Sequence, residues 1–193
     1  MKQYVFITGV AGSGKSTVSK VLRARGYAAY DIEQIDGLFA MYNTQTGERI
    51  IAHDNDSIEG VQQASWNCDL EKLQELMARE EHDISFYCGT ATNWQQLLPL
   101  FTKTILLVVS EDVTRERLTT RTTGEFGRTA EVQDWVLSWK AWWEREMEQA
   151  GAEVVCTDQP LEQVVAEILS RSEFPEGREA RREQFGEHNS PLS

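Results

Sequence analysis

Short apolar runs of strand length alternate along the chain with longer segments in which apolar residues recur every three or four positions. The short runs are rich in aromatic and β-branched residues, which favour extended backbone. They predict strands at residues 4–8, 27–30, 84–88, 104–109 and 153–156. The last-but-one run is the most apolar of them, so we expect it to form a central strand.

The segments between these runs carry helical signals. Apolar residues at helical spacing predict helices at residues 15–25, 69–77, 94–98, 111–122, 130–150 and 161–169. Asp69 and Ser110 precede two of these segments, and their side chains are suited to capping a helix. Because strands and helices alternate, the pattern predicts an α/β fold of three layers, with a five-stranded parallel sheet and helices on both faces.

Two stretches have less regular patterns. Between the second and third strands, residues 34–41 predict a short helix, and turn residues at 43–47 lead into a small hairpin arm at 48–52. In the long helix, Trp135, Trp139 and Trp143 recur at helical spacing. Packing against the sheet is the default expectation for these side chains, and stacking on a base or sugar is the alternative.

Composition and charge limit the classes of partner. The chain has 193 residues, enough for one α/β domain, which we assign to residues 1–170. Residues 171–193 are mostly charged or Gly, Pro, Ser and Asn, and predict a flexible polar tail. The net charge of -12 argues against nucleic acid or an anionic membrane surface as the main partner.

Hydropathy and cysteine content predict a cytoplasmic protein. No apolar run is long enough to span a bilayer, and the first residues lead directly into a strand, which leaves no room for a signal peptide. The three cysteines lack metal-binding spacing, and Cys88 and Cys156 are expected to be buried thiols in strands. A reducing compartment suits such thiols. We expect a monomer or a homodimer.

The strongest chemical signal follows the first strand. Residues 9–16 read GVAGSGKS and match the phosphate-binding pattern G-x-x-x-x-G-K-[ST] at every position. Glycines let such a loop turn its N–H groups toward a polyphosphate, and a helix starting at Lys15 adds the positive end of its dipole. We expect Lys15 to contact the β- and γ-phosphates and Ser16 to bind Mg²⁺. The predicted ATP-binding residues here are Gly9, Ala11, Gly12, Ser13, Gly14, Lys15, Ser16 and Thr17.

Two carboxylates follow the second strand. Asp31 and Glu33 are two residues apart and point the same way if the segment stays extended. We expect Asp31 to help hold Mg²⁺, and Glu33 to accept a proton from a substrate hydroxyl or to orient the substrate. The alternative is that both are carboxylates favoured by the dipole at a helix start. The acids after Ser110 are better explained as first-turn helix residues than as metal ligands.

Arginines follow the fourth strand. Arg121 ends the pattern L-x-x-R, and Arg128 lies seven residues further on, across a loop with two glycines. Guanidinium groups stabilise the charge of a phosphoryl group in transfer, and a glycine-containing loop at 122–130 is suited to act as a lid. Arg115 and Arg117 are more simply explained as solvated residues on a helix.

With these motifs, the chain resembles the nucleoside-monophosphate-kinase and shikimate-kinase branch of P-loop kinases over nearly the whole domain. The resemblance rests on the phosphate loop, on Asp31-x-Glu33, on Arg121 with Arg128, and on Thr157 after the last strand. It implies the sheet order 2-3-1-4-5, Arg121 against the adenine, Arg128 on the phosphates, and Thr157 beside the base. Residues 35–69 are the expected acceptor-binding region.

The acceptor side departs from that family. Gly89 stands alone where shikimate kinases have a glycine run, and Thr129 and Ala130 follow the lid arginine where a proline is usual. In this respect the chain resembles bacterial kinase-like ATPases with no assigned substrate.

The sequence therefore predicts an ATP- and Mg²⁺-dependent phosphotransferase. A nucleoside or nucleotide is the first acceptor we expect, and a sugar acid or shikimate-like alcohol is the second. The alternative is a nucleotide-binding regulatory ATPase without a small-molecule acceptor. A kinase of nucleic-acid ends is disfavoured by the acidic charge, and no N-K-x-D motif favours a GTPase.

Overall fold

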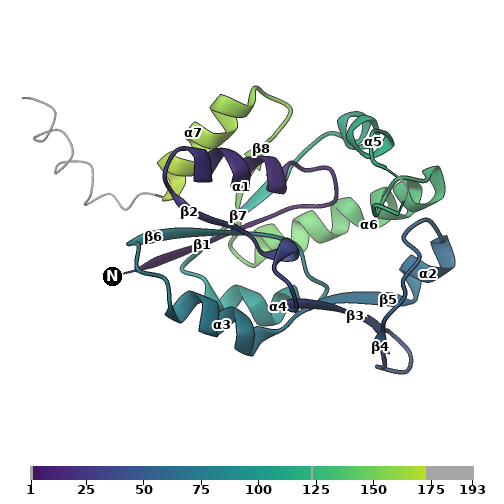
Figure 1. Ribbon diagram of the computed structural model, residues 1–193. Helices are drawn as coiled ribbons and strands as arrows, with labels where there is room; N and C mark the ends of the chain where they lie inside the picture. Colours follow the sequence, from purple (N-terminus) through teal and green to yellow (C-terminus); the bar gives the residue numbers. More distant parts are fainter. Residues whose placement is uncertain (1, 123, 173–193) are drawn as a thin grey trace, which may run out of the picture.

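The computed structural model describes residues 2–122 and 124–172 (Figure 1). Five parallel strands form its main sheet, in the order β2-β6-β1-β7-β8. They are β1 (Gln3–Thr8), β2 (Ala28–Asp31), β6 (Ile84–Cys88), β7 (Lys103–Val108) and β8 (Glu153–Cys156). Numbered within this sheet, the order is 2-3-1-4-5, so the predicted topology is confirmed. The very apolar β7 is an interior strand, and β1 rather than β7 is the middle one.

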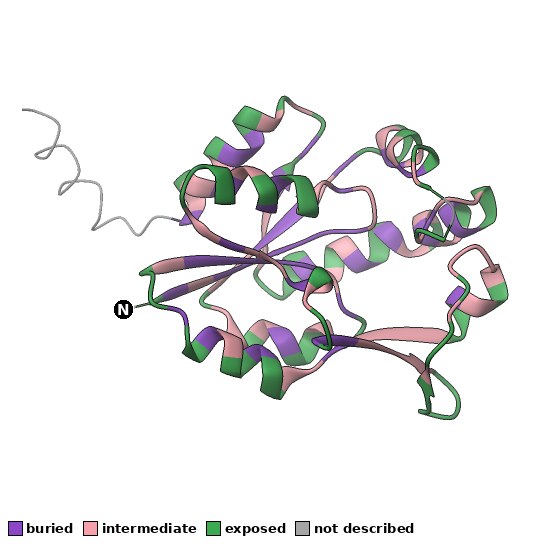
Figure 2. Cartoon of the chain, viewed as in Figure 1, coloured by how far each residue is buried: buried purple, intermediate pink, exposed green. Residues whose placement is uncertain are grey.

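Helices cover both faces of the main sheet, as predicted (Figure 1). Alternate residues of β1 face opposite layers: Val5 packs in one buried cluster and Phe6 in another, as expected for a strand that is buried on both sides. Helices α1 (Lys15–Ala24) and α7 (Leu161–Ser172) complete the first layer. The other layer contains α3 (Leu70–Ala78), α4 (Trp94–Leu97) and α6 (Ala130–Gln149). Figure 2 shows the buried residues concentrated in the strands and on the inner sides of these helices.

A second sheet corrects the sequence prediction for residues 34–41. Those residues do not form a helix: a 3-10 turn, η1 (Ile32–Gln34), is followed by Gly37 at φ 72° and then by strand β3 (Phe39–Asn43). Strand β3 pairs with β5 (Ala64–Cys68) on one side and with β4 (Arg49–Ile50) on the other, all antiparallel. Pairing satisfies the backbone of β3 while Phe39 is buried in the core, which a surface helix would not achieve.

The predicted hairpin arm is present in this second sheet, because Met41 of β3 pairs with Ile50 of β4. The sequence reading missed strand β5 and the short helix α2 (Ile58–Gln62) that precedes it. The largest differences in helix length are at α5, which ends earlier than predicted and spans Glu111–Thr119, and at α7, which extends to Ser172. Beyond Ser172, the predicted tail at 171–193 lies outside the described residues.

Two side-chain predictions have different outcomes. Trp135, Trp139 and Trp143 form a continuous edge-to-face series along α6, which agrees with the packing expectation. Cys88 is buried, but the prediction for Cys156 was wrong, since this thiol is exposed at the end of the outer strand β8. Within the described part of the chain, the helices are too short or too polar to cross a membrane.

Candidate functional site

The phosphate loop connects β1 to α1 at the carboxyl edge of the main sheet (Figure 1). Gly12 and Gly14 have φ values of 85° and 100°, which residues with a Cβ rarely adopt. A Cβ on Gly9 would lie 2.6 Å from the carbonyl oxygen of Leu107 in β7. These positions therefore require glycine, and they hold the loop closely against the neighbouring strand.

Lys15 folds back over this loop. Its side chain is 12% exposed, and its Nζ donates hydrogen bonds to the carbonyl oxygens of Gly9 at 2.8 Å and Val10 at 3.3 Å. Burial lowers the pKa of Lys15, and the nearby carboxylate of Glu33, with Oε1 3.9 Å from Nζ, acts in the opposite direction. The amine is thus a partly desolvated charge, and an incoming phosphate would give it a better counter-ion than the loop carbonyls.

Glu33 is held in place by the loop that follows β6. The backbone N–H of Thr90 donates to Glu33 Oε1 at 2.9 Å, and the Thr90 hydroxyl donates to the Gly9 carbonyl oxygen at 2.6 Å. A Cβ on Gly89 would lie 2.6 Å from Cγ1 of Ile32. Gly89 therefore allows the end of β6 to approach η1, and this contact brings Glu33, Thr90 and the phosphate loop together.

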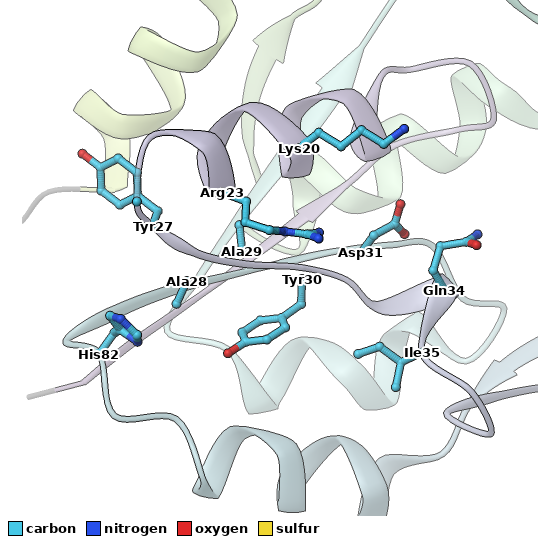
Figure 3. Close-up of a pocket in the computed structure, with 11 residues that line it drawn as sticks. Lys20, Arg23, Tyr27, Ala28, Ala29, Tyr30, Asp31, Gln34, Ile35 and His82 are labelled. Carbon is cyan, nitrogen blue, oxygen red and sulfur yellow. The ribbon is translucent and has the colours of Figure 1, made fainter.

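Asp31 takes a different direction from Glu33. The prediction that the two carboxylates are parallel assumed an extended segment, but the chain turns at η1 directly after Asp31. Asp31 lines a surface pocket of about 670 Å³ with Lys20 and Gln34, and Figure 3 shows its carboxylate directed toward the Lys20 side of α1. Lys20 lies one helical turn after Ser16, so Asp31 points along the same side of α1 that carries Ser16.

The oxygen donors suit Mg²⁺ that is also bound to a nucleotide. Neither Ser16 nor Asp31 makes a side-chain hydrogen bond with the described residues, which leaves a hydroxyl and a carboxylate as hard oxygen ligands. No group of three or more His, Cys, Asp or Glu side chains within residues 2–122 and 124–172 could hold a metal ion by itself. These two residues fit a metal whose other ligands come from phosphate and water.

Two arginines of the α5 region have distinct surroundings. Arg117 donates from Nη1 to the Gly12 carbonyl oxygen at 3.0 Å, and from Nη2 to the Thr157 carbonyl oxygen at 2.9 Å. Arg121 donates to the Phe126 carbonyl oxygen, and burial lowers its pKa while Glu125 and Glu33 oppose that effect. The charge of Arg121 also acts on Lys15. Thr157 is therefore in contact with Arg117, while Arg121 lies on the side of Lys15 and Glu33.

Leu118 connects the phosphate loop to the segment that carries Arg128. This side chain is fully buried, and a Cβ added to Gly12 would lie 3.5 Å from its Cγ. A Cβ added to Gly127 would lie 3.2 Å from its Cδ2. Gly127 has a φ of 86°, so both its backbone conformation and its close packing favour glycine. Leu118 thus packs against both Gly12 of the phosphate loop and Gly127, and Arg128 is the next residue after Gly127.

Arg128 itself binds the carboxylate of Asp56, in the loop between β4 and α2; residues 35–69, the predicted acceptor region, are called the acceptor arm from here on. Its Nε donates to Asp56 Oδ1 at 3.2 Å and its Nη2 to Asp56 Oδ2 at 2.7 Å. This hydrogen bonding from Arg128 lowers the pKa of Asp56 and raises the pKa of Arg128. The guanidinium is therefore paired with the predicted acceptor region, at 35–69, instead of with the phosphate loop.

A second pocket, of about 470 Å³, lies on the small sheet within that region. Its lining residues are Phe39, Ala40, Met41, Arg49, Ile50, Ile51, His53, Asn55 and Trp66. The Phe39 and Trp66 rings stack with centroids 5.2 Å apart and an interplanar angle of 24°. The backbone N–H of Trp66 donates to Thr92 Oγ1 at 3.0 Å, and the backbone N–H of Thr92 donates to the Trp66 carbonyl oxygen at 2.7 Å. The pocket is thereby attached to the same loop that holds Glu33.

The sequence reading did not select Thr90, Arg117 or Asp56 as site residues. Arg117 is four residues before Arg121, so the two share a face of the helix predicted at 111–122, and this spacing is the signal that could have found Arg117. Thr90 follows a predicted strand directly, at the sheet edge where ligands bind. Asp56 has no local signal, because its partner is 72 positions away in the sequence.

Comparison with known proteins relates the chain to a family and to a fold. The family model described as an AAA domain matches residues 5–138. A nucleotide-binding protein from Coprothermobacter proteolyticus is 30% identical over 89 residues, which cover 45% of this chain. The match spans only 31% of that relative's length.

Two solved structures are similar over nearly the whole chain. The protein TT1252 from Thermus thermophilus has a TM-score of 0.55 at 18% identity and covers 90% of this chain and 99% of its own. A gluconokinase from Sinorhizobium meliloti has a TM-score of 0.51 at 23% identity and covers 96% of this chain and 98% of its own. At these identities the likeness is one of fold, and it confirms the kinase-like P-loop fold that the sequence motifs implied.

Proposed function

Because the chain belongs to the AAA domain family, we propose that it is an ATP- and Mg²⁺-dependent phosphotransferase acting on a small metabolite. The observation that carries this proposal is the position of Lys15. Its amine is folded over a glycine-rich loop, with Glu33 Oε1 3.9 Å away and the charge of Arg121 nearby. A phosphate-binding cation beside a carboxylate and a second cation is the arrangement that phosphoryl transfer to a hydroxyl or phosphate oxygen requires.

On the donor side, the backbone of residues 9–17 binds the polyphosphate and Lys15 neutralises the β- and γ-phosphates. Ser16 and Asp31 hold Mg²⁺, which supplies charge neutralisation when it is bound. Asp31 supports this assignment because its carboxylate has no protein partner among the described residues and points along the Ser16 side of α1.

On the acceptor side, Glu33 accepts the proton of the attacking oxygen, or orients that oxygen. As the oxygen forms its bond to the γ-phosphorus, the bond from that phosphorus to the bridging oxygen of ADP breaks. The hydrogen bond from Thr90 N keeps Glu33 Oε1 oriented, and the second carboxylate oxygen remains for the substrate. Arg121 and Arg128 stabilise the charge on the transferred group.

Arg117 gives a test of where the base of ATP lies. It bridges Gly12 and Thr157, so its planar guanidinium lies between the phosphate loop and the loop after β8, where a base can stack on it. We expect Arg117→Ala to raise the dissociation constant of ATP by about tenfold, while the similar substitution Arg115→Ala has little effect. Titration with a fluorescent ATP analogue measures both. An equal, small change in the two variants would favour Arg121 as the base-contacting residue instead.

The acceptor is a nucleoside or nucleotide, in our proposal, and a sugar acid or shikimate-like alcohol is the second candidate. The pocket on the small sheet supports the first choice. Its lining has a stacked aromatic pair, apolar neighbours and three polar side chains, Arg49, His53 and Asn55, but no carboxylate. Flat rings stack on such aromatic surfaces, and the absence of acids suits an anionic ligand in a chain of net charge -12.

Trp66 therefore separates the two acceptor classes. If a base stacks on its ring, Trp66→Ala should raise the KM for the acceptor about tenfold or more, because stacking on an aromatic side chain contributes roughly 1–3 kcal/mol per base. The KM for ATP should stay unchanged. Trp142→Ala is the matched control, since that ring is 57% exposed on α6. If the wild type phosphorylates a sugar acid and Trp66→Ala does so at the same rate, the second class of acceptor is favoured.

The proposal as a whole is tested by ADP release from Mg-ATP in the presence of nucleosides, nucleoside monophosphates, sugar acids and shikimate, with Lys15→Ala as the blank. Stimulation by one class identifies a metabolite kinase and its acceptor. ATP binding without stimulation by any of them supports the alternative, a regulatory ATPase without a small-molecule acceptor. We expect the enzyme to work in the cytoplasm as a monomer or a homodimer.

A further inference from the structure

The pair formed by Arg128 and Asp56 joins the two halves of the site. Both carboxylate oxygens of Asp56 accept hydrogen bonds from Arg128, at 3.2 and 2.7 Å. The side chains are only partly exposed, at 34% for Arg128 and 23% for Asp56. A bidentate contact of this kind fixes one orientation of the guanidinium. The orientation selected here is toward the acceptor arm.

The backbone of Arg128 nevertheless starts close to the phosphate loop. Leu118 fills the space between Gly12 and Gly127, and a Cβ on either glycine would contact it at 3.5 or 3.2 Å respectively. Arg128 is the next residue after Gly127. Its long side chain can therefore turn either to the arm or to a phosphate bound in the loop, without a change in the anchored glycine.

The contact with Asp56 is weak enough to be exchanged. A partly exposed ion pair has a small net free energy, because solvent screens it and its side chains lose freedom. A polyphosphate also offers charged oxygens to a guanidinium, so a bound nucleotide and Asp56 compete for Arg128. A ligand that weakens the contact of Asp56 therefore shifts Arg128 toward the nucleotide.

The segment that holds Asp56 also lines the acceptor pocket. His53 and Asn55 contribute to the pocket on the small sheet. Asn55 donates from Nδ2 to the Gly124 carbonyl oxygen at 2.8 Å, and the Thr129 hydroxyl donates to the Asp56 carbonyl oxygen at 3.5 Å. A ligand that contacts His53 or Asn55 therefore acts on the same short segment that positions Arg128.

From these contacts we propose that Asp56 is a positioning residue that keeps Arg128 on the acceptor arm until an acceptor occupies the adjacent pocket. The inference rests on the proposed phosphotransferase function. When the acceptor fills the pocket, the Arg128 guanidinium leaves Asp56 and binds the γ-phosphate. The negative charge of the transferred group is therefore stabilised only when the acceptor is bound. In the absence of acceptor, the site lacks this arginine, and water is a poor substitute for the acceptor.

Asp56→Asn tests this inference, since it keeps the shape of the side chain but removes its charge. We expect acceptor-free ATP hydrolysis to rise about two- to fivefold, the range of a partly exposed ion pair, and the ratio of acceptor-stimulated to acceptor-free turnover to fall by the same factor. Asp134→Asn is the matched control, because it removes the Arg115–Asp134 pair, whose atoms are 2.7 Å apart on α5 and α6. That variant should match the wild type in both rates.

A binding measurement keeps the test independent of turnover. Trp135 lies edge-to-face with Phe126, two residues before Arg128, so tryptophan fluorescence can report nucleotide binding. Asp56→Asn should lower the dissociation constant of ATP two- to fivefold, and melting temperatures verify that both variants fold. If no acceptor stimulates the wild type, the proposed function fails, but this binding shift still tests the exchange.

Two results would overturn the inference. An Asp56→Asn variant with wild-type hydrolysis and wild-type ATP affinity would mean that Asp56 does not compete for Arg128. A variant that loses turnover as Arg128→Ala does would mean that Asp56 holds Arg128 in its working position. A higher rate with tighter ATP binding is the outcome that supports it.

Discussion

Lys15→Ala is expected to reduce ATP turnover by about a thousandfold or more, because Lys15 is the one charged side chain among residues 9–16 that can neutralise the β- and γ-phosphates. The lysine amine is held by the carbonyl oxygens of Gly9 and Val10, at 2.8 and 3.3 Å. The lysine side chain is therefore already held over the loop in which the phosphates bind. Since burial lowers the pKa of this amine, part of its desolvation is already complete before the nucleotide binds.

Arg79→Ala is the control for this experiment. Arg79 lies at the end of α3, its side chain is 80% exposed and pairs with Glu75, and it lines neither pocket, so its loss should leave ADP release unchanged. Equal melting temperatures would show that neither substitution disturbs the fold. Wild-type turnover in Lys15→Ala would remove the phosphate loop from the mechanism and, with it, the proposed function.

Arg128→Ala should lower kcat about a hundredfold while the KM for ATP changes little, as expected for a donor that acts mainly on the charge of the transition state. The reason lies in the two positions open to this side chain. In the absence of ligand it binds Asp56, with Nη2 2.7 Å from Oδ2, so it adds little to ground-state ATP binding. In the transition state it would face the transferred phosphoryl group.

Steady-state kinetics with saturating acceptor measures this effect, and Arg115→Ala is the control, since that arginine pairs with Asp134 away from the pocket. The comparison with Asp56→Asn is informative, because both substitutions break the same ion pair, but only Asp56→Asn should raise acceptor-free hydrolysis, while Arg128→Ala should leave that rate near the wild-type value. If the ion pair were merely structural, both substitutions would change acceptor-free hydrolysis in the same direction. An unchanged kcat in Arg128→Ala would exclude this residue from the chemistry.

The main sheet could be predicted because its signals are local. Each of its strands is a compact apolar run, and burial on both faces requires such runs wherever they occur in the chain. The small sheet could not be predicted in the same way. Strand β5 reads ASWNC and is only half-buried, so its pattern carries little information without its partner β3. Residues 39–43 form a strand through that pairing, although the sequence pattern predicts a helix up to residue 41 and a turn from residue 43.

The candidate site also has a part that the sequence predicts and a part that only tertiary packing decides. The prediction that Lys15 and Glu33 share one site agrees with their distance of 3.9 Å, although their catalytic roles stay predictions. The resemblance implies Arg121 and Thr157 as neighbours of the base, and in the structure the arginine that contacts Thr157 is Arg117. The helix predicted at 111–122 would carry both arginines on one face, but α5 ends at Thr119, so only Arg117 lies on the helix, and the packing of α5 near the loop after β8 brings it to Thr157.

What the sequence by itself determined is the phosphate loop with its strand and helix. Its glycines are required by local backbone conformation, and its lysine and serine follow at once in the chain. The tertiary structure alone decided that Thr90 orients Glu33 and that Asp56 binds Arg128. These contacts join residues 57 and 72 positions apart, so no local pattern encodes them, and they exist only because the sheet edge and the arm bring separate segments together.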